Sequence, residues 1–309
     1  MKPSVDATLL DGLVVAAYGK RYEVEIIDAS GSKQKISCVT RGKKTDLACG
    51  DLVNIKITDT ARKTAEGVVE KTLARKTLLY RSNAFKSKTL AANVTQIIIV
   101  LATQPSFYEA LLNRCLIAAE AAGIKALIVL NKCDLSPNNT DALDKLAVYK
   151  NLGYQVLALS AKDNISPLTP YLAQHTSVLV GQSGMGKSTI INALLPNENV
   201  RTREVSEVLD SGKHTTTAAH LYHLGEQSQL IDSPGLQEFG LHHLSISELE
   251  QAFIEFKPFL GKCRFNNCHH VHEPDCAVIA ASIAGFIAPI RLDCFRTLLT
   301  ESQVKQPYL

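Results

Sequence analysis

The stretch Gly181-Gln-Ser-Gly-Met-Gly-Lys-Ser188 decides how this chain of 309 residues is interpreted. It follows the pattern G-x-x-x-x-G-K-S, in which a glycine-rich loop presents backbone N–H groups to a phosphate at a helix N-terminus. A β-branched apolar run, 177–180, precedes the loop, and a helix-compatible run, 189–195, follows it. This strand–loop–helix setting predicts a nucleotide-binding α/β domain with a mainly parallel sheet and flanking helices. The alternative is a Gly/Ser surface turn that fits the pattern by chance.

The residues of the loop have separate expected roles. Lys187 would reach the β- and γ-phosphates of a bound nucleotide, and the Ser188 hydroxyl would bind its Mg²⁺. The other loop residues predicted to contact the nucleotide are Gly181, Gln182, Ser183, Gly184, Met185, Gly186 and Thr189.

Two motifs at the ends of predicted strands indicate which base is bound. The strand 126–130 runs into Asn131-Lys132-Cys133-Asp134, the N-K-x-D pattern with which G proteins select guanine. The Asp134 carboxylate would accept hydrogen bonds from guanine N1–H and the exocyclic amine, whereas adenine would leave it unpaired. A helix-capping role is the alternative for this residue. The strand 154–159 ends in Ser160-Ala161-Lys162, whose backbone would face guanine O6.

Two segments after the phosphate loop match the switches of G proteins. One threonine of Thr215-Thr-Thr217 would bind Mg²⁺ and the γ-phosphate, and we choose Thr216. In Asp232-Ser-Pro-Gly235, Asp232 would act on Mg²⁺ through water, and the Gly235 N–H would contact the γ-phosphate. A threonine-rich loop and an ordinary turn are the alternatives.

The order of these motifs differs from that of Ras-like proteins, where the phosphate loop comes first. Here the base-reading motifs at 131 and 160 precede the loop at 181. A sheet like that of Ras-like proteins would show this order if its original termini were joined near 163–176 and new termini were opened after the second switch. The sequence therefore predicts a circularly permuted P-loop GTPase domain over residues 95–242.

The N-terminal region has a different pattern and a different charge. Residues 11–72 contain five short strand-like runs and no helical stretch, which predicts an OB-fold β-barrel over 1–76; an SH3-like barrel would have the same pattern. Residues 1–90 carry a net charge of +7 and the rest −4, so we expect RNA binding, with ordinary solvated lysines as the alternative. Predicted phosphate contacts are the loop 41–44, Arg75, Lys76, Arg81, Lys86 and Lys88. The polar residues 77–94 are interpreted as a linker.

A cysteine and histidine pattern marks the C-terminal region. Cys263-x4-Cys268-x-His270-x5-Cys276 places three thiolates and an imidazole within 14 residues. Zinc favours four such ligands in a closed tetrahedral site, so we predict one structural Zn²⁺ in a helical domain over 243–309. Spacing does not distinguish His270 from His269 or His272, and a chance cluster of reduced cysteines is the alternative. Predicted helices here span 247–256 and, as one helix or a pair, 277–300.

The composition, with 46% hydrophobic and 20% charged residues, is typical of a globular protein. The N-terminus lacks the apolar core of a signal peptide, and no apolar run is long enough to span a bilayer. Eight cysteines are too few and too unevenly spread for a disulfide scaffold. We therefore expect a cytoplasmic protein without a membrane partner.

Taken together, the permuted motifs, the barrel and the metal pattern resemble the ribosome small-subunit-dependent GTPase A family over essentially the whole chain. Further agreements are Gly50-Asp-Leu-Val53, Ala91-Ala-Asn-Val94, Gly212-Lys-His-Thr-Thr216 and Glu273-Pro274. The resemblance implies an OB-fold, a permuted GTPase domain and a zinc domain that act in late maturation of the 30S subunit. It also implies binding to 16S rRNA and stimulation by the subunit. The chain departs from the family's usual residues at Met185, Asp275 and Cys294-Phe295.

The residue that orients the attacking water is also suggested by resemblance. In Ras a Gln after D-x-x-G has this role, but Leu236 stands in that place here. The family points to His214 as the catalytic residue, and an imidazole of near-neutral pKa suits the task. A structural role in the switch loop is the alternative.

These observations predict a monomeric GTP hydrolase, with GTP and GDP as ligands, that acts as a late-stage maturation or checkpoint factor of the 30S subunit. One rival is an RNA-binding regulatory module in which guanine nucleotide is only a ligand and the ribosome is not the partner. A second rival, a metabolic ATPase or kinase, conflicts with the N-K-x-D pattern.

Overall fold

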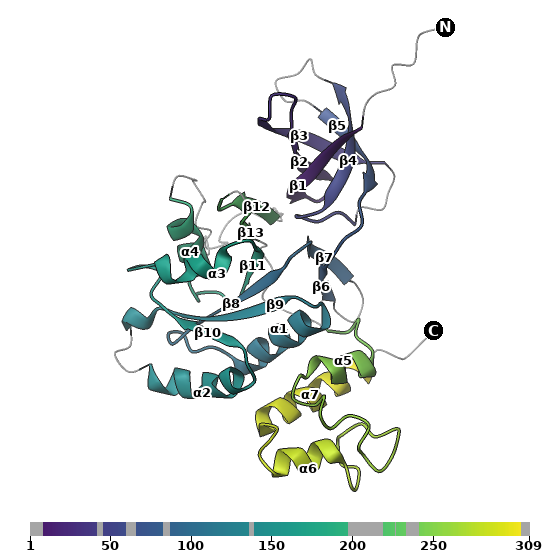
Figure 1. Ribbon diagram of the computed structural model, residues 1–309, viewed down its shortest axis with the longest axis vertical. Coiled ribbons are helices and arrows are strands. Elements are labelled where there is room, and N and C mark those ends of the chain that lie inside the picture. Colours follow the sequence, from purple (N-terminus) through teal and green to yellow (C-terminus); the bar gives the residue numbers. More distant parts are fainter. Residues whose placement is uncertain are drawn as a thin grey trace, which may run out of the picture.

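The structure is a computed structural model that describes residues 9–41, 46–59, 66–82, 87–135, 139–196, 219–225, 227–232 and 241–303. Figure 1 shows three parts along the longest axis: a β-barrel at one end, a parallel sheet with its helices in the middle, and a helical part at the other end.

The barrel consists of five strands, as predicted. They are β1 (Leu10–Tyr18), β2 (Arg21–Ile27), β3 (Lys33–Thr40), β4 (Leu52–Asp59) and β5 (Glu66–Thr72). Their order is β1-β2-β3-β5-β4, and pairing of β1 with β4 closes the barrel. Val14, Val24, Ile36 and Ile55 are fully buried inside it. In β2, β3 and β4 the buried residues alternate with less buried ones, which is what gives this barrel its apolar inner face.

The segment predicted to be a linker contains a β-hairpin instead. β6 (Leu78–Ser82) and β7 (Ser87–Ala92) pair antiparallel. The apolar side chains of Leu79 and Leu90 are buried in the same core as the parallel sheet. The apolar runs of the two strands are short and are separated by polar residues, so the sequence pattern did not predict strands here. Gly50 of the barrel (φ +90°) fits against this hairpin only without a Cβ, which would lie 2.1 Å from the Ala92 carbonyl oxygen.

The middle part is a sheet with the strand order β10-β9-β8-β11-β13-β12. Its parallel strands are β8 (Gln96–Ala102), β9 (Lys125–Asn131), β10 (Gln155–Ala158), β11 (Thr176–Val180) and β13 (Gln229–Asp232); β12 (Ala219–His223) runs antiparallel to β13. Every residue of β8 is buried, as expected for a strand covered on both faces. The helices of this part are α1 (Glu109–Ala121), α2 (Thr140–Asn151), α3 (Thr169–Leu172) and α4 (Lys187–Leu194), with 3-10 turns η1 (Cys133–Leu135) and η2 (Ser166–Leu168).

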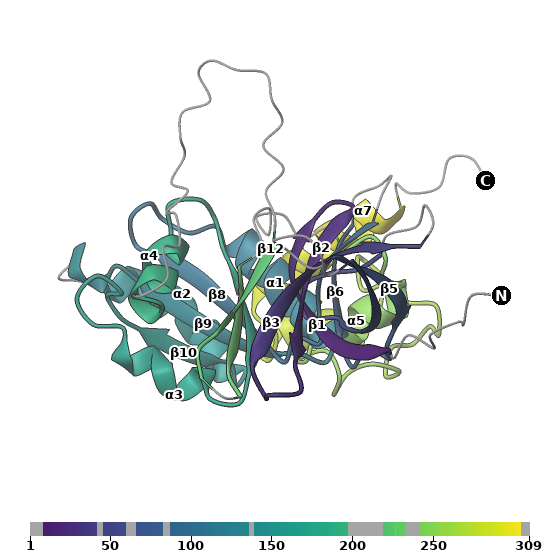
Figure 2. The ribbon, with the colours of Figure 1, turned by 90° about the horizontal axis from the view of Figure 1, so that it is seen from above.

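Barrel and parallel sheet are joined into one sheet of eleven strands. Strand β12 pairs with β1 through Ala16 opposite His220 and Ala17 opposite Ala219. The His223 Nε2 lies 2.9 Å from a carboxylate oxygen of Glu25 in β2, which adds a side-chain contact across the junction. Figure 2 shows β12 beside the barrel strands.

The C-terminal part contains α5 (Ile246–Ala252), α6 (Ala277–Ile283) and α7 (Pro289–Gln303). Of the one helix or pair predicted over 277–300, the structure therefore shows a pair. Helix α5 begins earlier than predicted because Ser245 and Glu248 form a capping box. It ends at Ala252 and not at 256, because Phe253 leaves the helical conformation and packs with Phe256 on Phe295. Within the described ranges, no helix combines the length and the hydrophobicity that crossing a membrane requires.

Buried polar contacts attach the C-terminal part to α1. The Arg291 side chain is fully buried; its Nε donates to Glu255 Oε1 at 2.5 Å and its Nη1 to Asn113 Oδ1 of α1 at 3.0 Å. The guanidinium carbon also lies 4.6 Å from the ring centroid of Phe253. Near the end of α7, Glu301 forms an ion pair with Arg114 of α1.

Candidate functional site

The motifs predicted from sequence meet at the carboxyl edge of the parallel sheet. Asn131 is the last residue of β9, the phosphate loop follows β11, and Asp232 is the last residue of β13. Because these strands run in the same direction, their carboxyl ends form one edge, where ligands of open α/β sheets bind. Lys132, Cys133 and Asp134 lie at the same edge, as do Ser160, Ala161 and Lys162 after β10.

Asn131 links three of these motifs. Its side chain is 2% exposed; Nδ2 donates to the Met185 carbonyl at 3.0 Å, and Oδ1 accepts from the Ala161 N–H at 2.9 Å. The loop before α4 must approach closely, because a Cβ on Gly186 (φ +93°) would lie 2.3 Å from Asn131 Nδ2. Hydrogen bonds of Asn131 therefore hold together the end of β9, the S-A-K element and the phosphate loop.

Lys187 lies at the centre of the phosphate loop. Its Nζ donates to the carbonyl oxygens of Gly181 and Gln182, both at 2.7 Å. Burial lowers the pKa of Lys187, and the nearby Asp232 carboxylate opposes this shift. The ammonium group of Lys187 is thus held inside the loop, near Asp232 at the end of β13.

A loop that sequence reasoning missed closes over this edge. The segment between β8 and α1 accepts a hydrogen bond at the Gln104 carbonyl from Lys132 Nζ, at 3.0 Å. The Tyr108 N–H donates to Gln182 Oε1, also at 3.0 Å. Both contacts join the segment before α1 to the nucleotide motifs. This segment directly follows the apolar run 97–101, which predicts a buried parallel strand, so the sequence could have placed it at the carboxyl edge of the sheet.

Several polar atoms at this edge lack protein partners. Three buried oxygens have no hydrogen-bond partner among the described residues: Ser160 Oγ, Thr103 Oγ1 and Asn139 Oδ1. Buried polar atoms are almost always paired, so such a group indicates that a ligand or water completes the site. Asp134 is exposed, with its carboxylate accessible to a ligand. The other predicted residues, Thr216, His214 and Gly235, lie outside the described residues.

The four predicted metal ligands converge in the C-terminal part. Their ligand atoms all lie within 4.8 Å of one another. The Sγ atoms of Cys263 and Cys276 are 3.8 Å apart, and His270 Nδ1 lies 3.3–3.6 Å from the three sulfurs. Tetrahedral zinc with Zn–S and Zn–N bonds of about 2.3 and 2.0 Å requires S–S and S–N separations of roughly 3.8 and 3.5 Å. The group Cys263, Cys268, His270 and Cys276 therefore fits a zinc site.

Neighbouring groups orient this cluster. The second ring nitrogen of His270 faces Glu250 of α5 at 3.5 Å, the kind of carboxylate contact that fixes a ligating imidazole. The Glu273 carboxylate accepts from the backbone N–H groups of His269, Val271 and His272. Burial would raise the pKa of Glu273, but these bonds lower it to about 2. Of the three rival histidines, only His270 belongs to the cluster found among the described residues.

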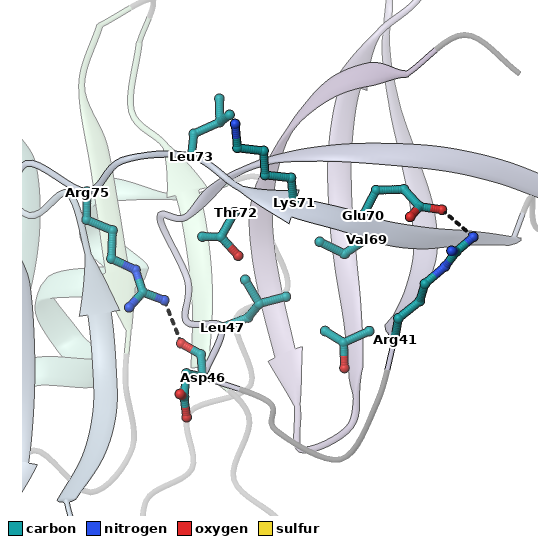
Figure 3. Close-up of a pocket in the computed structure, with 10 residues that line it drawn as sticks. Arg41, Asp46, Leu47, Val69, Glu70, Lys71, Thr72, Leu73 and Arg75 are labelled. Atoms are coloured by element: carbon teal, nitrogen blue, oxygen red, sulfur yellow. Dashed lines mark hydrogen bonds and ion pairs between the residues drawn. The ribbon is translucent and has the colours of Figure 1, made fainter. Parts of the chain in front are cut away.

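The barrel carries a groove with a volume of about 430 Å³. Figure 3 shows Arg41 bonded to Glu70 and Arg75 bonded to the Asp46 carbonyl along its walls. Arg75 also makes a bidentate ion pair with the buried Asp51, at 2.6 and 2.7 Å, so this predicted phosphate contact stabilises the barrel. Lys71 is exposed beside it.

Comparisons with known proteins agree with this geometry. The sequence profile of the family described as RsgA GTPase matches residues 72–242. The "Small ribosomal subunit biogenesis GTPase RsgA" of Nitrosospira multiformis is 49% identical over 96% of this chain and 93% of its own length; that of Ralstonia pickettii is 48% identical over 98% and 96%.

Two solved structures resemble the whole molecule. YjeQ from Thermotoga maritima superposes with a TM-score of 0.73 at 29% identity and covers 96% of this chain and 99% of its own. YloQ, described as a circularly permuted GTPase, has a TM-score of 0.70 at 26% identity and covers both chains fully. The permuted arrangement predicted from the order of motifs is thereby confirmed.

Proposed function

The chain belongs to the RsgA GTPase family, and from that premise we propose that it hydrolyses GTP to GDP and phosphate during maturation of the small ribosomal subunit. The single observation that carries the proposal is the bridge made by Asn131, which joins a guanine-reading strand to a formed phosphate loop. If the two motifs were chance matches on unrelated turns, nothing would require this contact between residues more than 50 positions apart.

We assign the nucleotide site as follows. Asp134 selects the base, Lys187 binds the β- and γ-phosphates, and the N-terminus of α4 supplies backbone N–H groups to them. On binding, the phosphates replace the two loop carbonyls that Lys187 now contacts. Ser188, Thr216 and Asp232 would hold Mg²⁺, which neutralises charge on the phosphates when bound. Gly235 would contact the γ-phosphate, and His214 would orient the water.

The partner is the 30S subunit, contacted through 16S rRNA. The basic N-terminal region supports this assignment, because phosphate contacts rely on Lys and Arg. Within the barrel groove we assign Lys71 and Arg41 to this contact, since both side chains are exposed even though Arg41 also pairs with Glu70. Arg75 is not assigned to it, because its guanidinium is committed to the buried Asp51. One Zn²⁺ held by Cys263, Cys268, His270 and Cys276 has a structural role, since four protein ligands leave no position for substrate. We expect a cytoplasmic monomer with domains close to 1–76, 95–242 and 243–309.

Phosphate release from GTP, with and without purified 30S subunits and with ATP as the control nucleotide, tests this function. We expect release from GTP only, strongly increased by the subunit. If GTP turnover is the same with and without the subunit, the assignment as a GTPase stands and the assignment of the ribosome as partner is rejected. Equal turnover of ATP would reject the assigned base selectivity.

A further inference from the structure

The N-terminus of α1 has no capping side chain of its own. Tyr108 is the N-cap residue, and its side chain makes no capping hydrogen bond. In a capping box the third helical residue accepts a hydrogen bond from the N-cap N–H, but that residue here is Leu111, which has no acceptor. Gln182 of the phosphate loop accepts this bond instead, through Oε1 at 3.0 Å. The phosphate loop therefore supplies the acceptor that α1 lacks.

The segment before α1 meets the nucleotide motifs at two further points. Lys132 of the base-reading motif donates to the Gln104 carbonyl at 3.0 Å. A Cβ placed on Gly184 of the phosphate loop would lie 3.7 Å from the ring of Pro105, which is ordinary van der Waals contact. A shift of α1 would therefore disturb atoms that touch both the base-reading motif and the phosphate loop.

A short way along the helix, α1 is attached to the C-terminal part. Asn113 accepts a hydrogen bond from Arg291 at 3.0 Å, and the fully buried Arg291 is itself fixed by Glu255 at 2.5 Å. The next residue, Arg114, forms an ion pair with Glu301 of α7. The five residues from the N-cap to Asn113 span only about 8 Å of helix, so both ends of this stretch move together.

Helix α7 continues these contacts to the zinc cluster. Arg296 Nη2 donates to the Val271 carbonyl at 2.7 Å, and the buried Phe295 ring lies 5.9 Å from the ring of the zinc ligand His270. Helix α1 packs on α5 and α7 as well as on β8 and β9 (Figure 1). An unbroken series of contacts thus joins the zinc cluster, α7, α1 and the phosphate loop.

We propose that Gln182 is a positioning residue through which α1 links the docking of the C-terminal part to the nucleotide affinity of the phosphate loop. Loss of the contact between α1 and the C-terminal part withdraws the support of α1 from the loop and weakens nucleotide binding. Because such coupling is reciprocal, bound nucleotide in turn tightens the docking of the C-terminal part. The inference rests on the proposed function, since it concerns the regulation of the same nucleotide site.

A double-mutant cycle on GDP affinity tests the link. Gln182→Met keeps the size of the side chain and removes the acceptor, whereas Asn113→Ala removes the contact with Arg291. We expect each change to weaken GDP binding about three- to tenfold, the range of one hydrogen bond. Distant residues without a shared partner normally have additive effects, but here the second change should add less than about twofold, because the link is already broken. Fluorescent GDP titration measures this, and additive effects would overturn the proposal.

Hydrogen exchange gives a readout that does not depend on turnover. GDP should increase the amide protection of α7 in the wild type, and Gln182→Met should lose this increase. An increase of the same size in Gln182→Met would contradict the link through α1.

A control variant separates the link from a general loss of stability. Val278→Ala shortens a fully buried side chain of α6 and leaves the contacts of Asn113 and Arg114 in place. It should destabilise the C-terminal part and leave GDP affinity unchanged. If Val278→Ala weakens GDP binding as much as Asn113→Ala does, the specific role of the α1 contact is rejected.

The proposed function and this inference fail in different ways. If the wild type does not bind GDP, both are rejected. If the wild type binds GDP and the effects of Gln182→Met and Asn113→Ala are additive, only the link through α1 is rejected. Zinc content and thermal unfolding of each variant establish that it is folded.

Discussion

The side-chain amide of Asn131 donates a hydrogen bond to the Met185 carbonyl at 3.0 Å and so ties the base-reading strand to the phosphate loop. Replacement by Ala leaves two buried backbone groups unpaired, so Asn131→Ala should lower the free energy of unfolding by about 1–3 kcal/mol. It should also weaken binding of GTP and GDP, because the loop loses its support. Urea unfolding and fluorescent nucleotide titration measure both effects. Asn54→Ala, on a half-buried side chain of β4 that donates to Asp11 far from the nucleotide motifs, is the control for nucleotide affinity. Equal nucleotide affinity of Asn131→Ala and wild type would contradict the bridge.

The proposed role of His214 predicts a loss of turnover without a loss of binding. His214→Ala should keep GTP affinity and reduce 30S-stimulated phosphate release by about 10²–10⁴-fold, the usual contribution of a group that orients or deprotonates water. Single-turnover kinetics with saturating subunit measures the chemical step. His175→Ala, located where the chain enters β11 at the opposite edge of the sheet, should leave the rate unchanged. Stimulated turnover equal to wild type would remove His214 from the mechanism.

Removal of zinc should unfold the C-terminal part selectively. Residues 257–276, which contain the cluster, form no helix or strand, whereas Phe253, Glu255 and Phe256 before them are buried against α7. We therefore expect zinc to order residues 257–276. Cys268→Ser or a strong chelator should abolish amide protection there while β8 and β9 stay protected. Hydrogen exchange with parallel metal analysis reports both. Full protection in a metal-free sample would mean that zinc has no structural role.

The buried ion pair between Arg291 and Glu255 predicts a non-additive pair of mutations. Arg291→Met leaves a buried carboxylate without its cation and should cost about 3–5 kcal/mol in unfolding free energy. The double variant with Glu255→Leu should recover most of this loss, because neither charge is then left alone. Chemical denaturation of the two single variants and the double variant completes the cycle. The exposed pair of Arg264 and Asp275 is the comparison, and Arg264→Ala should cost less than about 1 kcal/mol.

The ion pair between Glu301 and Arg114 predicts a dependence on pH. The hydrogen bond from Arg114 lowers the pKa of Glu301, so the charged carboxylate is favoured in the folded state. Its stabilisation is present above the ordinary glutamate pKa and is lost as pH falls below it. The stability difference between wild type and Glu301→Gln, less than about 1 kcal/mol at pH 7, should therefore shrink from about pH 5 downward. Arg114→Met should abolish the same difference, and a difference that grows in acid would contradict the assignment.

Local pattern was sufficient for most of the fold and the candidate site. The parallel strands β9, β10 and β11 consist mainly of apolar residues, and the N-K-x-D, S-A-K and phosphate-loop motifs lie at their carboxyl ends. The meeting of Asn131, Ser160 and Gly181 at one edge could therefore be deduced. The hairpin within 77–94 could not be deduced, because its strands are held by contacts with distant residues, such as the pairing of Ala91 with Cys49, 42 positions away. The end of α5 at Ala252 depends on aromatic packing against Phe295 and is equally invisible in the local sequence.

By itself, the sequence predicted the chemistry of this protein: a loop expected to bind phosphate, a carboxylate expected to select guanine, and three cysteines with a histidine whose spacing suits zinc. Those functions depend on residue types at short, fixed spacings, which are written directly in the chain. Only the tertiary structure decided which histidine joins the zinc cluster, that Arg75 is committed to Asp51, and that Arg291 anchors the C-terminal part to α1. It also decided that the loop before α1 supports Gln182 and Lys132, and that Ile283 and Phe286 face solvent. Each of these depends on which distant residue is near, and that is set by packing of the whole chain.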